Sequence, residues 1–365
     1  MIIGIGGAGG KLAAGISKEA TVINVSEVEM NKLGLANSIL AYTNNEKGQL
    51  VGSKKNPEIG KTAFNSVRSQ LLDLIKGNAI ITSSGGGTGN GISSQVLSYI
   101  SSLDTVREIN RTQFVIILPY AKKEPSEYVN NTIEFLQGPL WKAVDSTNTG
   151  NTFLFTNKLK FEGRMAESDF NKLICDSLSL FNSIPEKGDK YELLEGHIDR
   201  EDFEAYKAKS FFNYFTTFNY NPDRYFDEQM EENFNELLLR PDVPIESLFL
   251  LEVPENYDHR VFYNILDHFE AQKVTPIYSV VRNPKISEPK ITVSLLYSRK
   301  PADLVDDYNR VAEETTREKI KKSIDQNTNM ERVAVNLETK AEEVAREEGT
   351  EPSEIRNILK RLGKI

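Results

Sequence analysis

The sequence predicts an α/β protein built on a parallel sheet that helices cover on both faces. Continuous apolar runs are typical of strands buried on both faces, and they occur at residues 21–25, 113–119 and 152–156. Amphipathic helical patterns separate these runs, for example at 59–76. Glycine-rich loops follow two further short strands, and the ends of such strands are where parallel sheets bind ligands.

The second glycine-rich loop, residues 83–91, is the most informative stretch of the chain. It joins an apolar strand at 78–82 to a helix-prone segment at 92–100, and five of residues 85–91 are glycine. Such a run is costly in conformational entropy. A strand, a glycine loop and a helix in this order bring backbone N–H groups together where the helix dipole favours negative charge. The run therefore predicts a phosphate site, with a flexible surface loop as the alternative.

The first glycine-rich loop is ambiguous when it is taken alone. Gly4, Gly6 and Gly9 satisfy the dinucleotide fingerprint G-x-G-x-x-G, and Glu27 stands about twenty residues on, where a ribose-binding acid is expected. A P-loop is excluded because no lysine follows Gly9 directly. A dinucleotide-dependent oxidoreductase would use this loop but gives no role to the second one. Two phosphate loops on one sheet fit a nucleoside triphosphate better.

Three motifs resemble the tubulin and FtsZ superfamily. Residues 85–91 match its signature G-G-G-T-G-[ST]-G, with Asn90 at the one variable position. Residues 4–11 resemble the first nucleotide loop of FtsZ, G-x-G-G-x-G-N-N, although glycine and lysine replace the paired asparagines. Residues 56–60 reproduce the FtsZ motif N-P-E-[VI]-G, which follows the loop beside the γ-phosphate. The three motifs occur in the order that the family has.

The resemblance implies a GTPase that binds GTP or GDP with Mg²⁺ and assembles head to tail with copies of itself. Mg²⁺ would bridge the β- and γ-phosphates largely through water, and no protein ligand is assigned to it. Glu27 could instead cap a helix, and Glu127 is an alternative to Glu124. The residues expected at the nucleotide are Gly6, Gly7, Ala8, Gly9, Lys11, Asn24, Glu27, Asn56, Gly85, Gly86, Gly87, Thr88, Gly89, Asn90, Pro119, Glu124, Asn157 and Asn171.

Two of these residues, Asn157 and Asn171, predict that the base is guanine. Asn157 stands in a segment that resembles the strand-end motif P-N-D-[RK]-L of FtsZ, and Asn171 resembles the base-reading asparagine of tubulin's central helix. An amide side chain has a donor and an acceptor, so it can pair with guanine O6 and with N1 and N2. The family usually has an aromatic residue four positions before the second asparagine, where this chain has Glu167. Each asparagine could alternatively be a cap or turn residue.

Residues 196–204 resemble the superfamily's catalytic loop, G-x-x-N-x-D-x-x-[DE]. In the family this loop enters the nucleotide site of the next subunit, where its acids orient the attacking water. The register places Asp199 at the asparagine, Glu201 at the first acid and Glu204 at the second, and Asp202 is the alternative if the loop shifts by one residue. Acids beside a γ-phosphate can position water for phosphoryl transfer. An acidic helix N-terminus that only stabilises the dipole is the alternative.

Length and pattern predict four parts in this 365-residue chain. They are a GTP-binding domain at 1–167, a central helix with the catalytic loop at 168–204, a smaller α/β domain at 205–300 and a charged helical tail at 301–365. The central helix is expected at 169–183, and residues 184–189 should end or interrupt it. Its expected apolar stripe consists of Phe170, Leu173, Ile174, Leu178 and Phe181. The smaller domain has apolar strand patterns at 247–251, 276–281 and 291–296.

Composition fits a protein of a reducing cytoplasm, and the resemblance to this superfamily implies that of a bacterial host. The chain has one cysteine, Cys175, and no apolar run approaches the ~18 residues of a membrane span. The three histidines are not spaced as metal ligands. The net charge of −9 disfavours sequence-independent DNA binding across the body, and we expect no direct membrane partner.

Among the superfamily, the chain most resembles the TubZ group of plasmid- and phage-encoded tubulins. It carries neither the long linker of FtsZ nor the glutamate-rich tail of eukaryotic tubulins. This resemblance implies filaments that segregate plasmid or phage DNA through a DNA-binding adaptor similar to TubR on centromere-like DNA. A division or phage-positioning tubulin similar to FtsZ is the alternative. In the tail, an apolar stripe predicts a helix that docks on a neighbouring subunit or on a DNA-bound adaptor, and its residues are Ile355, Ile358, Leu359 and Leu362. Packing on the body of its own chain and weak direct contact with DNA or membrane are the alternatives.

Overall fold

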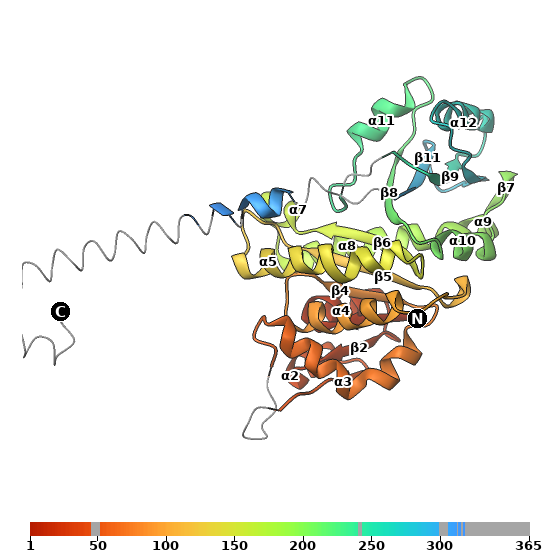
Figure 1. Ribbon diagram of the computed structural model, residues 1–365. Coiled ribbons are helices and arrows are strands. Elements are labelled where there is room, and N and C mark those ends of the chain that lie inside the picture. The colour runs from red at the N-terminus through yellow and green to blue at the C-terminus, as the bar shows by residue number, and fades with distance from the viewer. Residues whose placement is uncertain (45–51, 240–242, 299–305, 312, 315–316, 318–365) are drawn as a thin grey trace, which may run out of the picture. The chain divides into compact units, whose positions relative to one another are not determined.

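The computed structural model describes residues 1–44, 52–239, 243–298, 306–311, 313–314 and 317. Its N-terminal half is a parallel sheet of six strands joined by helices (Figure 1). The strands are β1 (Ile2–Ile5), β2 (Thr21–Asn24), β3 (Ser38–Leu40), β4 (Ala79–Ser83), β5 (Thr112–Leu118) and β6 (Thr149–Thr156). The helices are α1 (Gly6–Ile16), α2 (Glu27–Leu33), α3 (Pro57–Leu74), α4 (Thr88–Ser101), α5 (Ser126–Phe135), α6 (Trp141–Asp145), α7 (Lys158–Glu162) and α8 (Glu167–Asn182), with short turns η1 (Glu108–Asn110) and η2 (Leu136–Leu140). The prediction of a parallel α/β sheet is confirmed.

The C-terminal half continues the same sheet with mixed pairing. Its strands are β7 (Glu192–Gly196), β8 (Phe212–Asn219), β9 (Glu246–Val253), β10 (Ile277–Arg282) and β11 (Lys290–Tyr297). Its helices are α9 (Ile184–Lys190), α10 (Arg200–Lys207), α11 (Phe226–Glu232) and α12 (Phe262–Ala271), with the turn η3 (His259–Val261). The strand order is β3-β2-β1-β4-β5-β6-β8-β11-β9-β10-β7, and β11 is antiparallel to both β8 and β9.

The two halves meet where β6 pairs with β8, with Thr152 opposite Phe212. The expected parts at 1–167 and 205–300 therefore share one continuous sheet. Residues Met1–Tyr308 form one compact unit, and Asn309–Ile365 form a second. The boundary proposed near residue 204 stays a prediction.

The outermost strands of the sheet are short. β3, at one margin, has three residues, and β7, at the other, has five. The pairing of β7 with β10 shifts register between Val280 and Val281, and Gly196 ends β7 with a φ of +59°. A positive φ of this kind favours glycine.

The central helix α8 begins two residues earlier than the pattern predicts. Its buried stripe includes Phe170, Ile174, Leu178 and Phe181, whereas Leu173, which we expected in that stripe, is 38% exposed. As expected, α8 ends before residue 184, and the segment after it forms the separate helix α9. Proline is tolerated in the first turn of a helix, where its missing N–H has no intrahelical partner.

Aromatic side chains join the central helix to both halves of the sheet. The Phe181 ring of α8 stacks on Phe215 of β8 at a centroid distance of 4.8 Å. It also meets Phe153 of β6 edge to face at 5.6 Å and Phe203 of α10 at 5.1 Å. Each such pair adds about 0.5–1.5 kcal/mol beyond the apolar area that it buries. The cluster fixes α8 against the helix that carries the predicted catalytic acids.

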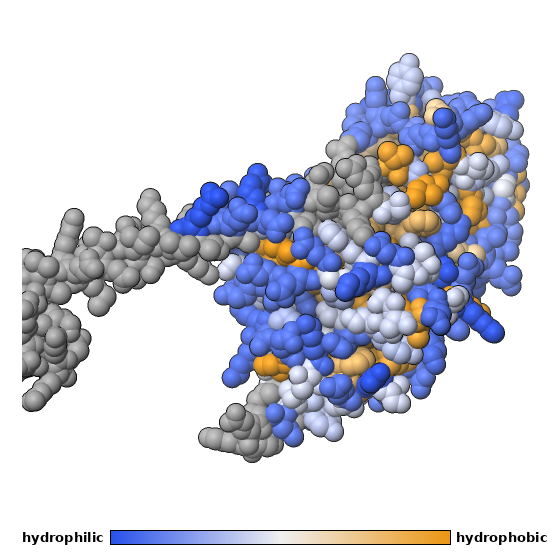
Figure 2. Space-filling view, viewed as in Figure 1, coloured by the Kyte–Doolittle hydropathy of each residue, from blue (hydrophilic) through white to orange (hydrophobic). Residues whose placement is uncertain are grey.

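Surface polarity differs between the two halves in the view of Figure 2. Hydrophilic side chains cover most of the N-terminal half, and hydrophobic ones gather over the part that carries β9, β11 and α12. Within the described residues, no helix combines the length and the hydrophobicity needed to cross a bilayer. The predicted docking stripe at residues 355–362 lies outside the described residues.

Tyr308, the last residue of the first unit, is fixed to the end of β5. Residues 306–311 are helical, and the Tyr308 side chain is buried with 2% of its surface exposed. Its hydroxyl donates a hydrogen bond of 2.6 Å to the Pro119 carbonyl oxygen. Burial raises the pKa of this hydroxyl, which keeps it protonated and able to donate. The contact ties the first part of the predicted tail to the strand end at which ligands of such a sheet bind.

We expect Tyr308→Phe to lower the free energy of unfolding by about 1 kcal/mol, because it removes this buried hydrogen bond without changing the ring. Urea denaturation measures the change. Tyr263→Phe is the matched control, since the Tyr263 side chain is 55% exposed. Equal midpoints for the two variants would show that the hydroxyl of Tyr308 contributes nothing to stability.

Candidate functional site

A pocket of about 790 Å³ lies at the carboxyl ends of the parallel strands, between the two glycine-rich loops. Most of the residues that the sequence predicts at a nucleotide line it: Gly7, Ala8, Lys11, Asn24, Gly85, Gly86, Gly87, Thr88, Gly89, Pro119, Glu124, Asn157 and Asn171. Five predicted residues do not line it: Gly6, Gly9, Glu27, Asn56 and Asn90. The volume is in the range of sites that hold a small molecule or cofactor.

The second glycine loop leads into the N-terminus of α4. This helix begins with no side-chain cap and no acidic residue in its first turn. The first N–H groups of a helix have no intrahelical partner, and its dipole makes this end positive. Because Gly87, Thr88 and Gly89 line the pocket, these N–H groups are positioned to bind an anion.

The glycines of this loop serve two different purposes. A Cβ at Gly85 would come within 2.9 Å of the Tyr128 side chain, and one at Gly87 would come within 2.8 Å of the Asn56 nitrogen. One at Gly89 would meet the Thr82 hydroxyl at 2.9 Å. At Gly86, however, the nearest atom is the Ser83 hydroxyl at 3.3 Å. Close packing within the protein therefore explains the other three glycines. Gly86 has the loosest surroundings of the four, and it lines the pocket.

The first glycine loop packs its backbone against the second loop and β4. Gly6 has a φ of +75°, and a Cβ there would lie 2.8 Å from the nitrogen of Gly89. A Cβ at Gly9 would lie 2.1 Å from the Ile81 carbonyl oxygen. These two predicted residues set the backbone path, and Gly7 and Ala8 beside them line the pocket.

Asn90 and Asn56 also shape the loop and do not line the pocket. The Asn90 side chain is 3% exposed, and its amide donates to the carbonyl oxygens of Ser84, at 2.5 Å, and Asn131, at 2.9 Å. The Asn56 side chain accepts from the Glu58 backbone nitrogen at 3.0 Å and caps α3. Both asparagine side chains therefore form their hydrogen bonds with other residues of the protein.

Beside β2, the structure brings Glu29 into the pocket instead of Glu27. Glu29 Oε2 accepts a hydrogen bond of 2.8 Å from the amide of Asn24, which is buried and lines the pocket. Glu27 is the first residue of α2 and is exposed. Ser26 caps this helix by accepting from the Glu29 nitrogen. The spacing of Ser26 and Glu29 is the S-x-x-E capping pattern, so the sequence held a signal that could have found Glu29.

At the end of β5 and β6, Glu124 and Asn157 contact each other. The Asn157 amide donates to Glu124 Oε2 at 3.0 Å, and the same oxygen accepts from the Tyr120 nitrogen at 2.6 Å. Glu127, the alternative to Glu124, lies in the first turn of α5 and does not line the pocket. Of the two acids proposed here for the nucleotide, Glu124 is therefore the one that lines the pocket.

An ion pair joins α1 to α8 across the pocket wall. Lys11 Nζ lies 2.7 Å from Glu167 Oε1, and both side chains are about half exposed, at 51% and 52%. The hydrogen bond from Lys11 lowers the pKa of the Glu167 carboxyl. Asn171, one turn further along α8, and the buried Phe170 line the pocket beside them.

Basic side chains that the sequence reasoning missed also line the pocket. They are Lys32, Lys54, Lys55 and Lys160, in addition to the predicted Lys11. A concave surface with several lysines raises the local concentration of anions. Within the described ranges, no group of three or more His, Cys, Asp or Glu side chains is arranged to hold a metal ion.

The three predicted catalytic acids lie on α10. Asp199 caps this helix by accepting from the Asp202 nitrogen at 2.8 Å. Glu201 is exposed, and the exposed Glu204 forms an ion pair of 2.8 Å with Lys207. The capping contact fits the alternative of a structural helix N-terminus for Asp199, whereas the Glu201 side chain has no such contact in the described residues.

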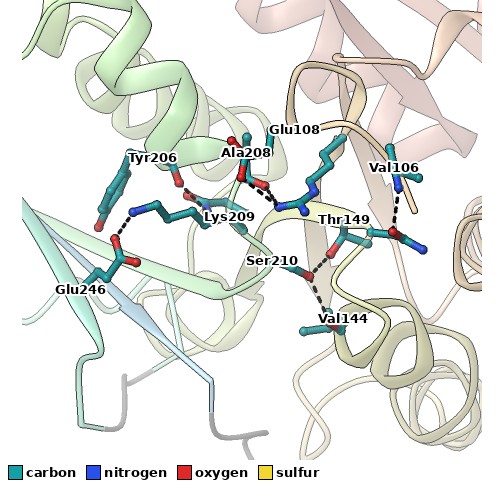
Figure 3. Close-up of polar contacts among 12 residues, drawn as sticks. Val106, Glu108, Val144, Thr149, Tyr206, Ala208, Lys209, Ser210 and Glu246 are labelled. Atoms are coloured by element: carbon teal, nitrogen blue, oxygen red, sulfur yellow. Dashed lines mark hydrogen bonds and ion pairs between the residues drawn. The ribbon is translucent and has the colours of Figure 1, made fainter. Parts of the chain in front are cut away.

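The end of α10 is fixed at the amino ends of β5 and β6, as Figure 3 shows. The Arg111 guanidinium donates to the Ala208 carbonyl oxygen at 3.1 Å, and the Asn151 amide donates to that of Lys209 at 2.9 Å. The Ser210 hydroxyl contacts that of Thr149 at 2.7 Å, and Lys209 pairs with Glu246. These contacts hold the helix at the end of the sheet opposite the pocket (α10 at the right of Figure 1, α7 at the left).

Strand β5 separates the acidic helix from the pocket within one chain. Arg111 precedes this strand of seven residues, and Pro119, which lines the pocket, follows it. At about 3.3 Å per residue, the strand alone spans roughly 20 Å. The carboxylates of Asp199, Glu201 and Glu204 therefore do not reach the pocket of their own chain.

No family model matches the chain, and no curated protein matches it by sequence. Solved structures do. TubZ of Clostridium botulinum phage c-st has a TM-score of 0.63 and 16% identity, over 87% of this chain and 98% of that chain. A GTPγS-form protofilament of TubZ from Bacillus thuringiensis serovar israelensis has a TM-score of 0.68 and 14% identity, over 88% and 93%. FtsZ from M. jannaschii, described as an empty dimer, has a TM-score of 0.58 and 17% identity, over 82% and 92%. The chain therefore has a tubulin/FtsZ-like fold that is close to the fold of TubZ.

Proposed function

We propose that this chain is a GTPase that polymerises head to tail into filaments and thereby segregates plasmid or phage DNA in the bacterial cytoplasm. The observation that carries the proposal is the placement of the pocket and the acidic helix α10 at opposite ends of β5. A second copy stacked end to end brings its α10 to the open pocket of the first. Protofilament and two-stranded filament structures of Bacillus thuringiensis TubZ support this arrangement.

The pocket offers a distinct place for each part of GTP or GDP. The phosphates bind at the N-terminus of α4 and against Gly86, where backbone N–H groups converge. Asn24, Glu29 and Glu124 supply polar atoms for the ribose. Asn171 contributes an amide for the base.

Hydrolysis is completed by the acids of the adjacent subunit. The exposed carboxylates of Glu201 and Glu204, with Asp199 at the cap of α10, orient the water that attacks the γ-phosphate. Mg²⁺, when bound beside the phosphates, would supply positive charge that offsets the phosphate charge. Because the two half-sites come from different chains, hydrolysis requires assembly.

A DNA-binding adaptor similar to TubR connects the filament to centromere-like DNA. The net charge of −9 disfavours direct contact with the phosphate backbone, so a separate basic protein suits the task. Resemblance to the TubZ group supports this part of the proposal. Capture of plasmid DNA by filaments only when the adaptor is present tests it. A filament that positions cell division or phage particles would capture no DNA in that assay.

We expect the purified chain to bind GTP and GDP and to show no binding of NADH at the same concentrations. Both glycine-rich loops line the pocket, and two phosphate loops suit a nucleoside triphosphate, whereas a dinucleotide would use only the first. Titration calorimetry with each ligand measures this directly. Binding of NADH without binding of GTP would overturn the proposed function and favour the dinucleotide-dependent oxidoreductase.

A further inference from the structure

The two polar residues at the start of α8 have a spacing suited to one ligand edge. Glu167 and Asn171 are four residues apart, so they lie one above the other on the same face of the helix. Both line the pocket. The carboxylate of Glu167 accepts hydrogen bonds only, whereas the Asn171 amide both donates and accepts.

Lining aromatic residues show which end of the pocket suits a purine ring. In the described part of the chain they are Tyr128 and Phe170. Tyr128 of α5 packs against Gly85 and therefore lies beside the glycine loop that the proposal gives to the phosphates. Phe170 is 2% exposed and lies between Glu167 and Asn171 on α8. Because a base needs apolar surface beside its polar edge, the first turn of α8 suits the base.

We propose that Glu167 is a guanine-specificity residue: its carboxylate accepts hydrogen bonds from N1–H and the N2 amino group, while the Asn171 amide donates to O6. The assignment deepens the proposed function and rests on it. Adenine presents an acceptor at N1 and no amino group at C2, so its edge would place lone pairs against the carboxylate. A site built in this way rejects the wrong base because its polar groups are left unpaired.

Lys11 is the positioning residue for this carboxylate. Its ammonium group bonds Oε1 at 2.7 Å, which fixes the direction of the Glu167 side chain from the neighbouring helix. A carboxylate has about four lone-pair sites, so Oε1 can serve Lys11 and one guanine donor while Oε2 serves the other. The lowered pKa of Glu167 keeps it ionised, and therefore acceptor-only, at neutral pH.

Exchange of the carboxylate for an amide gives a direct test. In Glu167→Gln, the new NH₂ group opposes the guanine N2 amino group but pairs with the C2 oxygen of xanthine. We expect the affinity for GTP to fall about 10- to 100-fold and the affinity for XTP to rise, so that the ratio of the two constants moves toward XTP. ITP, which lacks the N2 amino group, should bind the wild-type chain more weakly than GTP and lose that difference in Glu167→Gln.

Asp169→Asn is the matched control. Asp169 is exposed, lies in the same first turn of α8 and does not line the pocket. Asp169→Asn therefore removes one negative charge from this end of the helix, as Glu167→Gln does. It should keep the wild-type order of GTP, ITP and XTP. If Glu167→Gln binds all three as the wild type does, the role of Glu167 is refuted and the GTPase proposal stands. If the wild-type chain binds no GTP, the proposed function itself fails.

Discussion

Gly86→Val is expected to weaken GTP binding at least about 100-fold while leaving the free energy of unfolding nearly unchanged. A Cβ at this position meets only the Ser83 hydroxyl, at 3.3 Å, and a shift of a few tenths of an ångström in that side chain relieves the tight contact. The valine side chain would occupy the pocket wall where phosphate approaches the backbone. Loss of two hydrogen bonds to a charged group, each worth about 1.5–3 kcal/mol, accounts for the expected factor.

Fluorescence titration with labelled GTP measures the affinity, and thermal unfolding measures the stability. Gly138→Val serves as the control, because a Cβ at Gly138 meets nothing within 4 Å and the residue does not line the pocket. It should bind GTP as the wild type does. Unchanged affinity in Gly86→Val would remove this loop from the nucleotide site.

Glu201→Gln is expected to reduce GTP hydrolysis about 100-fold without weakening GTP binding to the monomer. The carboxylate lies on α10, at the end of β5 opposite the pocket, so it cannot contact nucleotide bound to its own chain. The expected factor is the lower end of what a positioned acid or base contributes. The variant should form filaments that persist because their nucleotide is not hydrolysed.

Phosphate release, measured against protein concentration, separates this mechanism from hydrolysis within one chain. The wild-type rate per molecule should rise with concentration, since each complete site needs two copies. Glu270→Gln makes the same chemical change at an exposed carboxylate on α12; it is the control and should hydrolyse GTP normally. A rate per molecule that is independent of concentration would argue that assembly is not required.

The sequence was most informative where structure depends on local signals. Buried strands followed by glycine loops predict the parallel sheet, and Asn56 before a proline fixes the start of α3. Glu27 shows how a local sequence signal can lead to the wrong one of two nearby acids. The fingerprint counts residues from the glycines, but the cap at Ser26 decides which acid of α2 enters the pocket, and that acid is Glu29.

Features that depend on tertiary contacts could not be predicted in this way. Lys11 and Glu167 are 156 positions apart, and their pairing depends on how α1 packs against α8. The burial of Asn90 follows from the approach of α5, whose Asn131 carbonyl accepts its amide. Likewise, the contact between Tyr308 and Pro119 joins the end of the first compact unit to the residue after β5 across 189 positions, and no periodic pattern encodes it.

The short outer strands of the sheet have a consequence for solubility. A long, flat strand edge offers unpaired backbone groups to another chain and promotes cross-β aggregation. β3 offers only three residues, and β7 is irregular in register and ends at a glycine with positive φ. Glu192 and Glu195 place charges along β7, which further disfavours an added strand. Both margins are thus protected against uncontrolled backbone pairing, even when the protein is concentrated.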